Sequence, residues 1–442
     1  MKQMFVAPLS ALVALGGCQY AAQDKTAART TDQSYGALPS LPKPHPTLIP
    51  TVNIAPAISW PKGMKPTTAP GLAVNAFASG LDHPRWLHVL PNGDILVAET
   101  NAPPKPAGSS SLREIIMNAV MKRAGAGVPS ANRISLLRDA DGDGIAEIKS
   151  VFLENLNSPF GMALIGSTLY VANTDAIVAF AYETGALHLA GPSTILTSLP
   201  AGPINHHWTK DIIASPDGTK LYATVGSNSN VGENGIANEQ NRAAVLEIDI
   251  ATKSSRIFAS GLRNANGLSW QPKSGVLWVA VNERDEIGND LVPDYMTSVK
   301  DGGFYGWPYS YYGQTVDTRV RPARPDLVAS AIAPDYALGA HTASLGLAFN
   351  DKKLFPARFI DGAFIGQHGS WNRSPIAGYK VIFVPFSGGM PSGTPETILD
   401  GFVNAKQQAM GRPVGVALDK AGALLVADDV GNVIWRVVPT KP

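Results

Sequence analysis

The sequence predicts an all-β protein that folds as a six-bladed β-propeller with one short helical insertion in the first blade. The main observation is a repeat: six times, a short apolar strand is followed several residues later by a second strand that ends in a Val-Ala-like pair. Strand–turn–strand units that recur at tens of residues are typical of propeller blades. The composition agrees, because Gly (43) and Pro (35) are abundant and only 16% of the residues are charged, as expected of a turn-rich β protein.

The six strand pairs are irregularly spaced but of one type. They cover residues 84–87 and 95–98, 159–162 and 169–172, 210–212 and 221–224, 266–269 and 277–280, 344–347 and 362–365, and 413–416 and 424–427. A closed propeller can use a chain of this length as one domain, which we predict over residues 71–442. Each unit then takes roughly sixty residues, so loop insertions are expected. We expect the functional residues on the blade-entry loops at one mouth of the channel.

Residues 1–18 have the features of a lipoprotein signal peptide. A basic second residue precedes an apolar run from Met4 to Leu15, which is too short to span a bilayer, and Leu15-Gly16-Gly17-Cys18 supplies small residues for cleavage. The Leu-Gly-Gly-Cys sequence resembles the bacterial lipobox, which implies that Cys18, the single cysteine, is lipidated. Gln19 after it favours the outer membrane, with the protein on the periplasmic face of the cell envelope. An ordinary secretory signal with an incidental cysteine is the alternative.

Residues 19–70 are rich in Pro, Thr, Ala and Ser. Such a stretch buries little apolar surface, so we predict a stiff Pro-rich tether between the lipid anchor and the propeller. Within it, the segment from Ile54 to Trp60 is apolar enough to dock on the propeller.

The first blade is interrupted by a segment with a helical pattern. Ser111-Leu112-Arg113-Glu114 is a capping box, and the apolar residues near it recur at helical spacing: Leu112, Ile115, Ile116, Ala119 and Val120. We expect a helix of about three turns, stopped by Gly125 and Gly127. It either packs on the outside of the propeller or acts as a lid or a membrane-surface contact.

The segment from Asp139 to Glu147 is the strongest metal-like motif. It carries oxygen ligands at alternate positions with glycines between them, as in the Ca²⁺ loop of an EF-hand. The candidate ligands are Asp139, Asp141, Asp143 and Glu147. The twelfth position is Ser150 instead of a bidentate Glu, and predicted strands flank the loop. A Ca²⁺ site and a bare acidic hairpin turn fit this pattern equally well.

Two adjacent histidines, His206 and His207, enter the third blade. Because neighbouring strand residues point to opposite faces, at most one of them is expected to face the channel. Zinc would need further His, Cys or carboxylate partners, and the sequence offers no convincing set. A general base is the better functional interpretation, and a loop histidine bonded to the backbone is the alternative.

Arg263 and Asn264 enter the fourth blade, where their guanidinium and amide groups suit a ligand with carboxylates or hydroxyls. The following strand leads into an acidic segment with Glu283 and Asp285, and then into a Gly-Gly-Phe-Tyr-Gly-Trp-Pro turn that contains Tyr305. Acidic groups beside this turn form a second possible cation site. Its candidate ligands are Glu283, Asp285 and Tyr305.

These motifs resemble a known family. Arg263-Asn264-x-x-Gly267 at a blade entry, followed by an acidic loop and Gly-Gly-x-Tyr-Gly-Trp-Pro, is similar to the soluble aldose and glucose dehydrogenases that use pyrroloquinoline quinone (PQQ) on a six-bladed propeller. Within this PQQ-dependent sugar dehydrogenase superfamily, residues 139–147, 157–162 and 368–374 resemble the sorbosone dehydrogenase group more closely. The likeness spans about residues 71–438.

The resemblance implies roles for individual residues. The catalytic histidine of the superfamily falls on His207, and its cofactor-binding pair falls on Arg263 and Asn264, with Arg263 also stabilising charge on the reacting oxygen. Later cationic cofactor residues fall at Arg373 and Arg412, which suits the three carboxylates of PQQ. A salt bridge across blade loops is the alternative for both. The Gly-Pro whose carbonyls hold the cofactor's Ca²⁺ in the family is absent here, so the resemblance leaves the Ca²⁺ ligands open.

The activity that the resemblance implies is oxidation of an aldose or a sugar aldehyde such as sorbosone, with PQQ and Ca²⁺ as cofactors and a hydride transferred to the quinone. No haem motif is present, so electrons would pass to an external acceptor, a quinone or a cytochrome. A net charge of +1 without a basic stripe argues against a nucleic-acid partner, and membrane contact is expected through the lipid anchor only. The alternatives are a non-catalytic carbohydrate-binding propeller and a calcium-dependent propeller lactonase or hydrolase.

Overall fold

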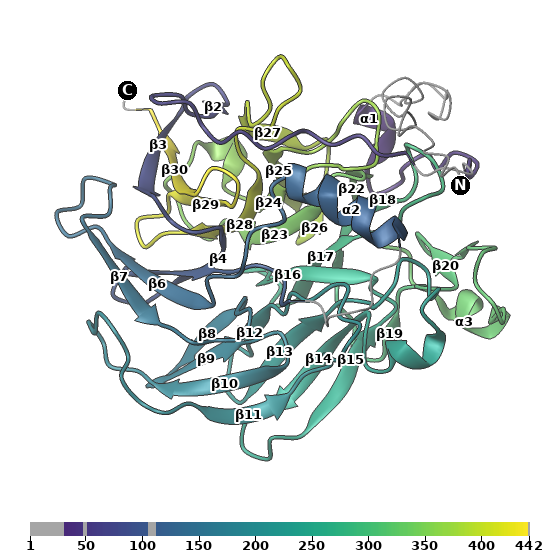
Figure 1. The fold of residues 1–442 in the computed structure, drawn as a ribbon, viewed down its shortest axis with the longest axis horizontal. Helices are drawn as coiled ribbons and strands as arrows, with labels where there is room; N and C mark the ends of the chain where they lie inside the picture. Colours follow the sequence, from purple (N-terminus) through teal and green to yellow (C-terminus); the bar gives the residue numbers. More distant parts are fainter. Residues whose placement is uncertain (1–30, 47–50, 105–111, 441–442) are drawn as a thin grey trace, which may run out of the picture.

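The computed structural model describes residues 31–46, 51–104 and 112–440, and it shows six β-sheets arranged as blades around a common centre (Figure 1). The innermost strands of the blades contact one another in a closed ring: β4 lies beside β8, then follow β12, β16, β23 and β28, and β28 returns to β4. The predicted all-β, six-bladed propeller is therefore confirmed.

The strands of the first three blades follow one another along the chain. Blade one contains β4 (Pro84–Val89), β5 (Ile95–Glu99), β6 (Arg133–Arg138) and β7 (Ile148–Leu153). Blade two contains β8 (Met162–Ile165), β9 (Thr168–Ala172), β10 (Ala176–Ala181) and β11 (Thr194–Ser198). Blade three contains β12 (Ile212–Ala214), β13 (Lys220–Val225), β14 (Ala244–Asp249) and β15 (Ser255–Ser260), with β19 (Gly303–Phe304) added in parallel at its edge.

The last three blades include strands from distant parts of the chain. Blade four contains β16 (Asn264–Trp270), β17 (Leu277–Asn282), β18 (Pro293–Ser298), β22 (Tyr336–Ala340) and β1 (Tyr35–Gly36). Blade five contains β23 (Ser344–Phe349), β24 (Gly362–Gln367), β25 (Lys380–Ser387), β27 (Glu396–Asp400) and β2 (Thr67–Thr68), and β26 (Met390–Pro391) pairs with β25. Blade six contains β28 (Pro413–Leu418), β29 (Leu424–Asp428), β30 (Val433–Pro439) and β3 (Leu72–Ser79).

Short elements lie outside the blades. The α-helices are α1 (Thr31–Ser34), α2 (Leu112–Arg123) and α3 (Pro325–Ser330), and the 3₁₀ helices are η2 (Ile236–Glu239) and η3 (Ala357–Phe359). A separate hairpin is formed by β20 (Ser310–Tyr311) and β21 (Thr315–Val316). The predicted helical insertion in blade one is confirmed as α2, which connects β5 to β6.

The ring is closed by a strand from the start of the folded region. β3 pairs antiparallel with β30, in a register that runs from Leu72 opposite Pro439 to Ser79 opposite Val433. This pairing places a strand that precedes the first blade beside the last strand of blade six, where β3 forms the outer edge of the sheet. The strand pairs predicted from the repeat are the inner two strands of each blade, whereas this closure was not among the sequence predictions.

Glycines in the repeat allow the inner strands to approach one another. A Cβ atom on Gly267 would lie 2.6 Å from the backbone nitrogen of Leu347 in the next blade, and one on Gly415 would lie 2.6 Å from the carbonyl oxygen of Arg85. Gly161 and Gly346 meet the next inner strand in the same way. The glycine that recurs in the repeat is therefore required by backbone contact between neighbouring blades.

The segment predicted as a Pro-rich tether, residues 19–70, is docked on the propeller over its described residues. Its β1 and β2 add edge strands to blades four and five, and the backbone N–H of Asn53 donates to the carbonyl oxygen of Trp371 (2.8 Å). Ala55 is completely buried. Edge strands of a sheet offer unpaired backbone groups, which explains why a segment of low intrinsic order is held there.

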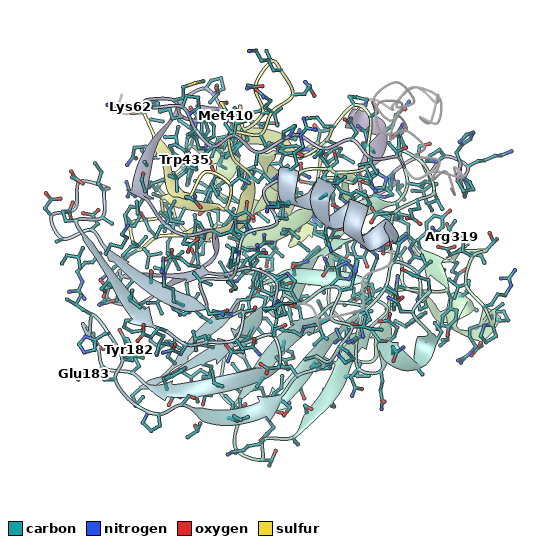
Figure 2. The ribbon with its side chains drawn as sticks, in the orientation of Figure 1. Lys62, Tyr182, Glu183, Arg319, Met410 and Trp435 are labelled. Atoms are coloured by element: carbon teal, nitrogen blue, oxygen red, sulfur yellow. The ribbon has the colours of Figure 1, made fainter. Side chains whose placement is uncertain are left out.

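Asp428, at the end of β29, ties this N-terminal segment to blade six. Its carboxylate accepts hydrogen bonds from Nε1 of Trp60 (2.7 Å) and from Nε1 of Trp435 (3.0 Å), which is labelled in Figure 2. It also accepts the backbone N–H groups of Arg412 and Gly431, both at 2.8 Å. Burial raises the pKa of Asp428 to about 6. This network fixes the backbone of Arg412, whose side chain enters the site described next.

No helix among the described residues is long and apolar enough to cross a membrane. Cys18 and the predicted signal peptide, residues 1–18, lie outside the described residues. The lipid anchor therefore stays a prediction from the sequence.

Candidate active site

A cavity of about 330 Å³ lies where the blade-entry loops converge. Strands alternate in direction within an antiparallel blade, so the entry to a first strand and the exit from a second strand lie at the same end. The cavity is lined by segments that enter the first strand of a blade or leave its second strand. These segments come from blades one, three, four, five and six. Its polar lining residues include His83, Arg85, His206, His207, Asn264, His368, Arg412 and Asp429. The cavity therefore belongs to one mouth of the propeller.

The C-terminal end of α2 forms an apolar wall of this cavity. Met121 and Ala124 line it, and Figure 1 shows α2 lying across the face of the ring. Asn101, at the end of β5, holds the segment after the helix because its Nδ2 donates to the carbonyl oxygens of Ala126 (3.1 Å) and Val128 (2.7 Å). The helix thus lies at the mouth of the propeller, and its role as a lid or as a membrane-surface contact stays a prediction.

His207 is held in one tautomer. Its Nδ1 lies 2.9 Å from the carbonyl oxygen of Ser227 and 3.0 Å from the Ser227 hydroxyl. A carbonyl oxygen only accepts, so the Nδ1 of the neutral ring carries the proton and Nε2 carries the lone pair. Burial lowers the pKa of His207 well below its ordinary value, and the charges of His206 and Arg263 lower it further. At neutral pH the ring is therefore a neutral imidazole whose Nε2 can accept a proton.

His206 also lines the cavity, which corrects the expectation that at most one of the two histidines faces it. The two rings are perpendicular, with centroids 4.6 Å apart. Both residues precede β12, which begins at Ile212, so the alternation of side chains along a strand does not apply to them. They differ in burial, since His206 is exposed and His207 is half-buried.

A cluster of four residues, His83, Arg85, His368 and Asp429, lies on the cavity wall formed by blades one, five and six. We call it the Asp429 cluster. Oδ2 of Asp429 accepts hydrogen bonds from Nη1 of Arg85 (2.7 Å) and Nε2 of His368 (2.9 Å). Nε2 of His83 lies 3.5 Å from the same oxygen. Burial alone would raise the pKa of Asp429, but His368, His83 and Arg85 lower it below its usual range. Burial lowers the pKa of His368 to about 4, and the guanidinium of Arg85 is the permanent cation beside the Asp429 carboxylate.

Several polar atoms at the cavity are buried and have no hydrogen-bond partner among the described residues. They are Nε and Nη2 of Arg412, Nε of Arg85, Nε2 of His83, Oδ1 of Asn264 and Oδ1 of Asp429. The guanidinium carbon of Arg412 lies 4.7 Å from the ring centroid of Tyr379, and its Nη1 makes only long contacts of 3.4 Å to two carbonyls. Buried donors are normally satisfied, so this wall is suited to a bound polar or anionic ligand.

Arg263 does not line the cavity, although Asn264 beside it does. The guanidinium of Arg263 is occupied by Asn230, whose carbonyl (3.1 Å) and side-chain oxygen (3.0 Å) it contacts, by the Glu283 carbonyl (2.7 Å) and by Asp285 (3.4 Å). With its donors engaged, Arg263 acts on the site through its charge on His207. The structure thus brings together His207, Asn264 and Arg412 from the predicted set and holds Arg263 behind them.

Arg373, predicted to contact a cofactor, is also engaged elsewhere. Its Nε donates to the carbonyl oxygen of Asn289 (2.9 Å), its Nη1 to the carbonyl oxygen of Pro375 (2.7 Å) and its Nη2 to Oδ1 of Asp290 (2.9 Å). It is buried and is not among the residues that line the cavity. The structure therefore shows the salt bridge between blade loops that was the alternative for this residue.

The second predicted cation site does not come together. The Glu283 carboxylate bonds to Arg284 (2.9 Å), the Tyr305 hydroxyl donates to the carbonyl oxygen of Ser298 (2.5 Å), and the Asp285 carboxylate accepts from Asn372 (2.8 Å) and His341 (3.1 Å). Burial raises the pKa of Asp285, but its hydrogen-bonded and charged partners lower it to about 2. Each of the three predicted ligands is thus committed to protein partners.

The first predicted cation site has converging carboxylates. Ligand atoms of Asp139, Asp141, Asp143 and Glu147 lie within 4.8 Å of one another, and this is the one such group of His, Cys, Asp or Glu among the residues that the structure describes. The loop connects β6 to β7, so strand direction places it at the end of the propeller opposite the cavity. The carboxylates also accept backbone N–H groups of their own loop, as in an acidic turn. An ion bound there would not contact a ligand in the cavity.

The members of the Asp429 cluster were not among the predicted site residues. Weak signals existed: Arg85 stands in the first blade-entry segment, Asp429 follows the Val-Ala pair of the last repeat, and His368 opens a motif that the resemblance had singled out. These signals do not reveal that the three side chains meet, because residue 85 and residue 429 become neighbours only through closure of the ring.

Comparison with known proteins agrees with this arrangement. A family model described as TrAA12-like matches residues 130–300 and 326–440, which is more than half of the chain. The chain belongs to the TrAA12-like family. An uncharacterized protein of Borreliella burgdorferi is 28% identical to this TrAA12-like protein over 298 residues, covering 65% of the chain and 77% of the relative. The family model does not distinguish the sorbosone group, so that assignment stays a prediction from the sequence.

Solved structures similar to this TrAA12-like protein share its fold at low sequence identity. A calcium structure of the Trichoderma reesei carbohydrate-active enzyme of family AA12 has a TM-score of 0.69 and 17% identity, covering 88% of this chain and 99% of that one. The holo form of the pyranose dehydrogenase PQQ domain from Coprinopsis cinerea has a TM-score of 0.68 and 18% identity, covering 87% and 100%. The PQQ-bound aldose sugar dehydrogenase from Streptomyces coelicolor has a TM-score of 0.54 and 16% identity, covering 84% and 99%.

Proposed function

We propose that this protein is a PQQ-dependent oxidoreductase that oxidises an aldose or a sugar aldehyde such as sorbosone and passes the electrons to an external acceptor. The observation that carries the proposal is the cavity itself, where a neutral His207 and a set of buried, unpartnered donors line the same space. The PQQ and sugar specificities named for the Coprinopsis and Streptomyces structures support it. The match to the TrAA12-like family supports it as well.

The residues at the cavity fit a polyanionic cofactor. PQQ carries three carboxylates, and the unpartnered nitrogens of Arg412 and Arg85 are donors that form strong bonds with such groups. Asn264 and His83 add neutral polar groups to the same wall. We therefore assign Arg412, Arg85 and Asn264 as cofactor-binding residues, and Arg263 and Arg373 as residues that hold the surrounding loops.

His207 is the base in this proposal. Bound PQQ supplies a quinone that accepts a hydride from the substrate carbon. Nε2 of His207 accepts the proton of the substrate hydroxyl, or of a hydrated aldehyde. The substrate thus loses a hydride from carbon and a proton from oxygen, which is a two-electron oxidation. The charge of Arg263, behind His207, disfavours the protonated ring and keeps the base free before each turnover.

Asp429 is the one carboxylate among the described residues that line the cavity. Calcium-dependent hydrolysis in a propeller would require two or three converging carboxylates at the mouth. This composition favours the oxidoreductase over the lactonase or hydrolase alternative.

Ca²⁺ is part of the proposal as a second cofactor. The acidic cluster of Asp139, Asp141, Asp143 and Glu147 supports a Ca²⁺ site, and the calcium structure of the Trichoderma enzyme is a precedent in a similar fold. Because this loop lies opposite the cavity, an ion there stabilises blade one and takes no part in proton transfer. Any Ca²⁺ that contacts the cofactor must use other ligands, such as backbone carbonyls.

Reconstitution tests the proposed function. Purified protein without cofactor is expected to reduce no dye, and addition of PQQ with Ca²⁺ is expected to produce dye reduction that depends on an aldose or on sorbosone. Comparison of PQQ alone, Ca²⁺ alone and both, with and without EDTA, separates the two cofactors. If PQQ neither binds nor supports dye reduction with any sugar or sugar aldehyde, the proposal is wrong and a binding propeller is favoured.

We further propose that Cys18 anchors the protein by lipid to the periplasmic face of the cell envelope, on the basis of the Leu15-Gly16-Gly17-Cys18 motif. Cys18→Ser is expected to move the protein from the membrane fraction into the soluble periplasmic fraction, with dye reduction by the reconstituted protein unchanged. Recovery of Cys18→Ser in the membrane pellet after a carbonate wash would contradict this proposal.

A further inference from the structure

A second hollow, of about 550 Å³, lies beside the active-site cavity. It is formed by the segment that leads from β11 toward β12 and by the loop between β13 and β14. Both segments are at the same mouth as the cavity, because one leads into the first strand of blade three and the other leaves its second strand. We call it the amide groove, after the side chains on one of its walls: Asn228, Asn238, Gln240 and Asn241.

The two walls of the amide groove differ in chemistry. One wall consists of Leu199, Pro200, Pro203 and Ile204, which offer apolar, conformationally restricted surface. The other carries the amides, which provide both donors and acceptors. A pyranose ring has the same division, with carbon–hydrogen faces that pack on apolar surface and hydroxyl groups that bond with amides.

One group of the groove is buried and unsatisfied. Asn228 is 4% exposed, and its Oδ1 has no hydrogen-bond partner among the described residues. The rest of the side chain is fixed, since its Nδ2 donates to the carbonyl oxygen of Asn238 (2.8 Å) and its backbone N–H donates to Glu239 (2.7 Å). A buried acceptor held in one orientation without a donor calls for a ligand hydroxyl or a bound water.

The groove has few charged side chains. It has no carboxylate among its described lining residues, and its one cationic residue, Arg242, is buried and already donates to Ala201 (2.9 Å), Gly226 (3.3 Å) and Asn205 (3.2 Å). A cation therefore finds no partner of opposite charge among these residues, and the donors of Arg242 are largely taken up by oxygens of the protein. Neutral, hydroxyl-rich molecules fit this wall best.

The groove and the active-site cavity share backbone. Ile204 lines the groove and His206 lines the cavity two residues later, while Asn228 of the groove follows Ser227, which holds Nδ1 of His207. A chain of sugar rings that reaches from the groove therefore ends close to the base. A single ring could occupy only one of the two sites.

We propose that the amide groove binds the outer sugar units of an oligosaccharide whose terminal unit reacts beside His207, which makes oligosaccharides the preferred substrate class. The inference rests on the proposed function for the reaction at the terminal unit, whereas binding in the groove can be measured without it. The groove adds contacts that a monosaccharide cannot make, so oligosaccharides bind more tightly than their monomers.

Direct binding tests the groove apart from catalysis. The probes are malto-, cello- and xylotetraose and the corresponding monosaccharides, titrated into the full mature protein without and with PQQ by calorimetry or NMR. At least one tetraose is expected to bind with a Kd at least about tenfold lower than its monomer, because its outer units form additional hydrogen bonds in the groove. Equal binding of every tetraose and its monomer would overturn the proposal.

Two variants localise the binding. Asn238→Ala with Gln240→Ala removes two exposed amides, and Ala237→Trp fills the groove. Both are expected to weaken tetraose binding by about tenfold or more and to leave monosaccharide binding unchanged. Gln314→Ala, which removes an exposed amide outside the groove, is the matched control and is expected to have no effect. Tetraose binding that survives both groove variants would place it elsewhere and overturn the assignment.

The outcomes separate the two proposals. Tetraose binding that is lost in the groove variants, in a protein that never reduces dye with PQQ, would support the groove and contradict the redox function. Dye reduction by monosaccharides, without any advantage for tetraoses and without an effect of Ala237→Trp, would support the redox function and contradict the groove.

Discussion

We expect His207→Ala to lower the turnover of the reconstituted protein by about 10²- to 10⁴-fold, which is the usual contribution of a positioned general base. The expected loss follows from the tautomer: Ser227 holds Nδ1, which leaves Nε2 as the nitrogen that would accept the substrate proton in the proposed reaction. PQQ binding is expected to stay close to normal, because the charged donors for its carboxylates come from Arg412 and Arg85. Stopped-flow measurement of dye reduction, with PQQ titrated separately, gives both quantities.

The neighbouring histidine provides the matched control. His206 also lines the cavity, but it is exposed and its ring is perpendicular to that of His207, so His206→Ala is expected to change turnover by less than about tenfold. Equal and mild losses in the two variants would mean that neither histidine transfers the proton.

The pH dependence of wild-type turnover gives a second test of His207. Its pKa lies well below the ordinary value because of burial and the nearby charges of His206 and Arg263. Protonation removes the base, and a lowered pKa moves that loss to lower pH. Turnover is therefore expected to stay level as the pH falls through about 6.5, where an unperturbed imidazole is half protonated. A decline centred near 6.5 would contradict the tautomer and burial argued for His207.

We expect Arg412→Ala to weaken PQQ binding by about 10²- to 10⁴-fold. Its Nε and Nη2 are buried donors without a partner among the described residues, and each hydrogen bond from a charged donor contributes about 1.5 to 3 kcal/mol. The affinity can be measured without turnover, because Trp208 and Trp371 line the cavity and a bound quinone is expected to quench their fluorescence. Arg412→Lys keeps the charge but loses the forked geometry, so an intermediate loss is expected.

The control for Arg412 is an arginine with a partner outside the site. Arg324 pairs with Asp326 at the surface, and Arg324→Ala is expected to leave PQQ affinity unchanged. Because Asp428 fixes the backbone of residue 412, the fold of Arg412→Ala should be retained and can be verified by thermal unfolding. Wild-type affinity for PQQ in Arg412→Ala would show that the unpartnered guanidinium does not serve the cofactor.

The repeat pattern determined the fold class because each unit carries its own signal. An inner strand, a turn and a second strand are adjacent in sequence, and glycines such as Gly267 and Gly415 stand where neighbouring blades touch. Local order also revealed α2, whose capping box and apolar spacing need no distant partner. His207 could be proposed as a base from the sequence because it stands just before a predicted first strand. The entry to a first strand lies at a mouth of the propeller in every blade.

What each predicted side chain contacts could be decided only by the tertiary structure. Arg263, Arg373 and Arg412 are alike in sequence terms, yet Arg263 is occupied by the loop around Asn230 and Arg373 by Asp290. In the part of the chain that the structure describes, Arg412 keeps two donors without a partner. The difference arises from which carbonyls and carboxylates of other blades come within hydrogen-bond distance, and a linear pattern does not contain that information.

The same reason explains the docked N-terminal segment and the Asp429 cluster. In the sequence, Trp60 is a single aromatic residue in a Pro-rich stretch. In the structure, its Nε1 donates a hydrogen bond to Asp428, which lies far away in the chain. Arg85 and Asp429 become an ion pair because β3 closes the ring on blade six and brings the first blade beside the last. The sequence by itself determined the repeated blades and the blade-entry loops that line the cavity. Ring closure decided which charges meet there, because it joins residues more than three hundred positions apart.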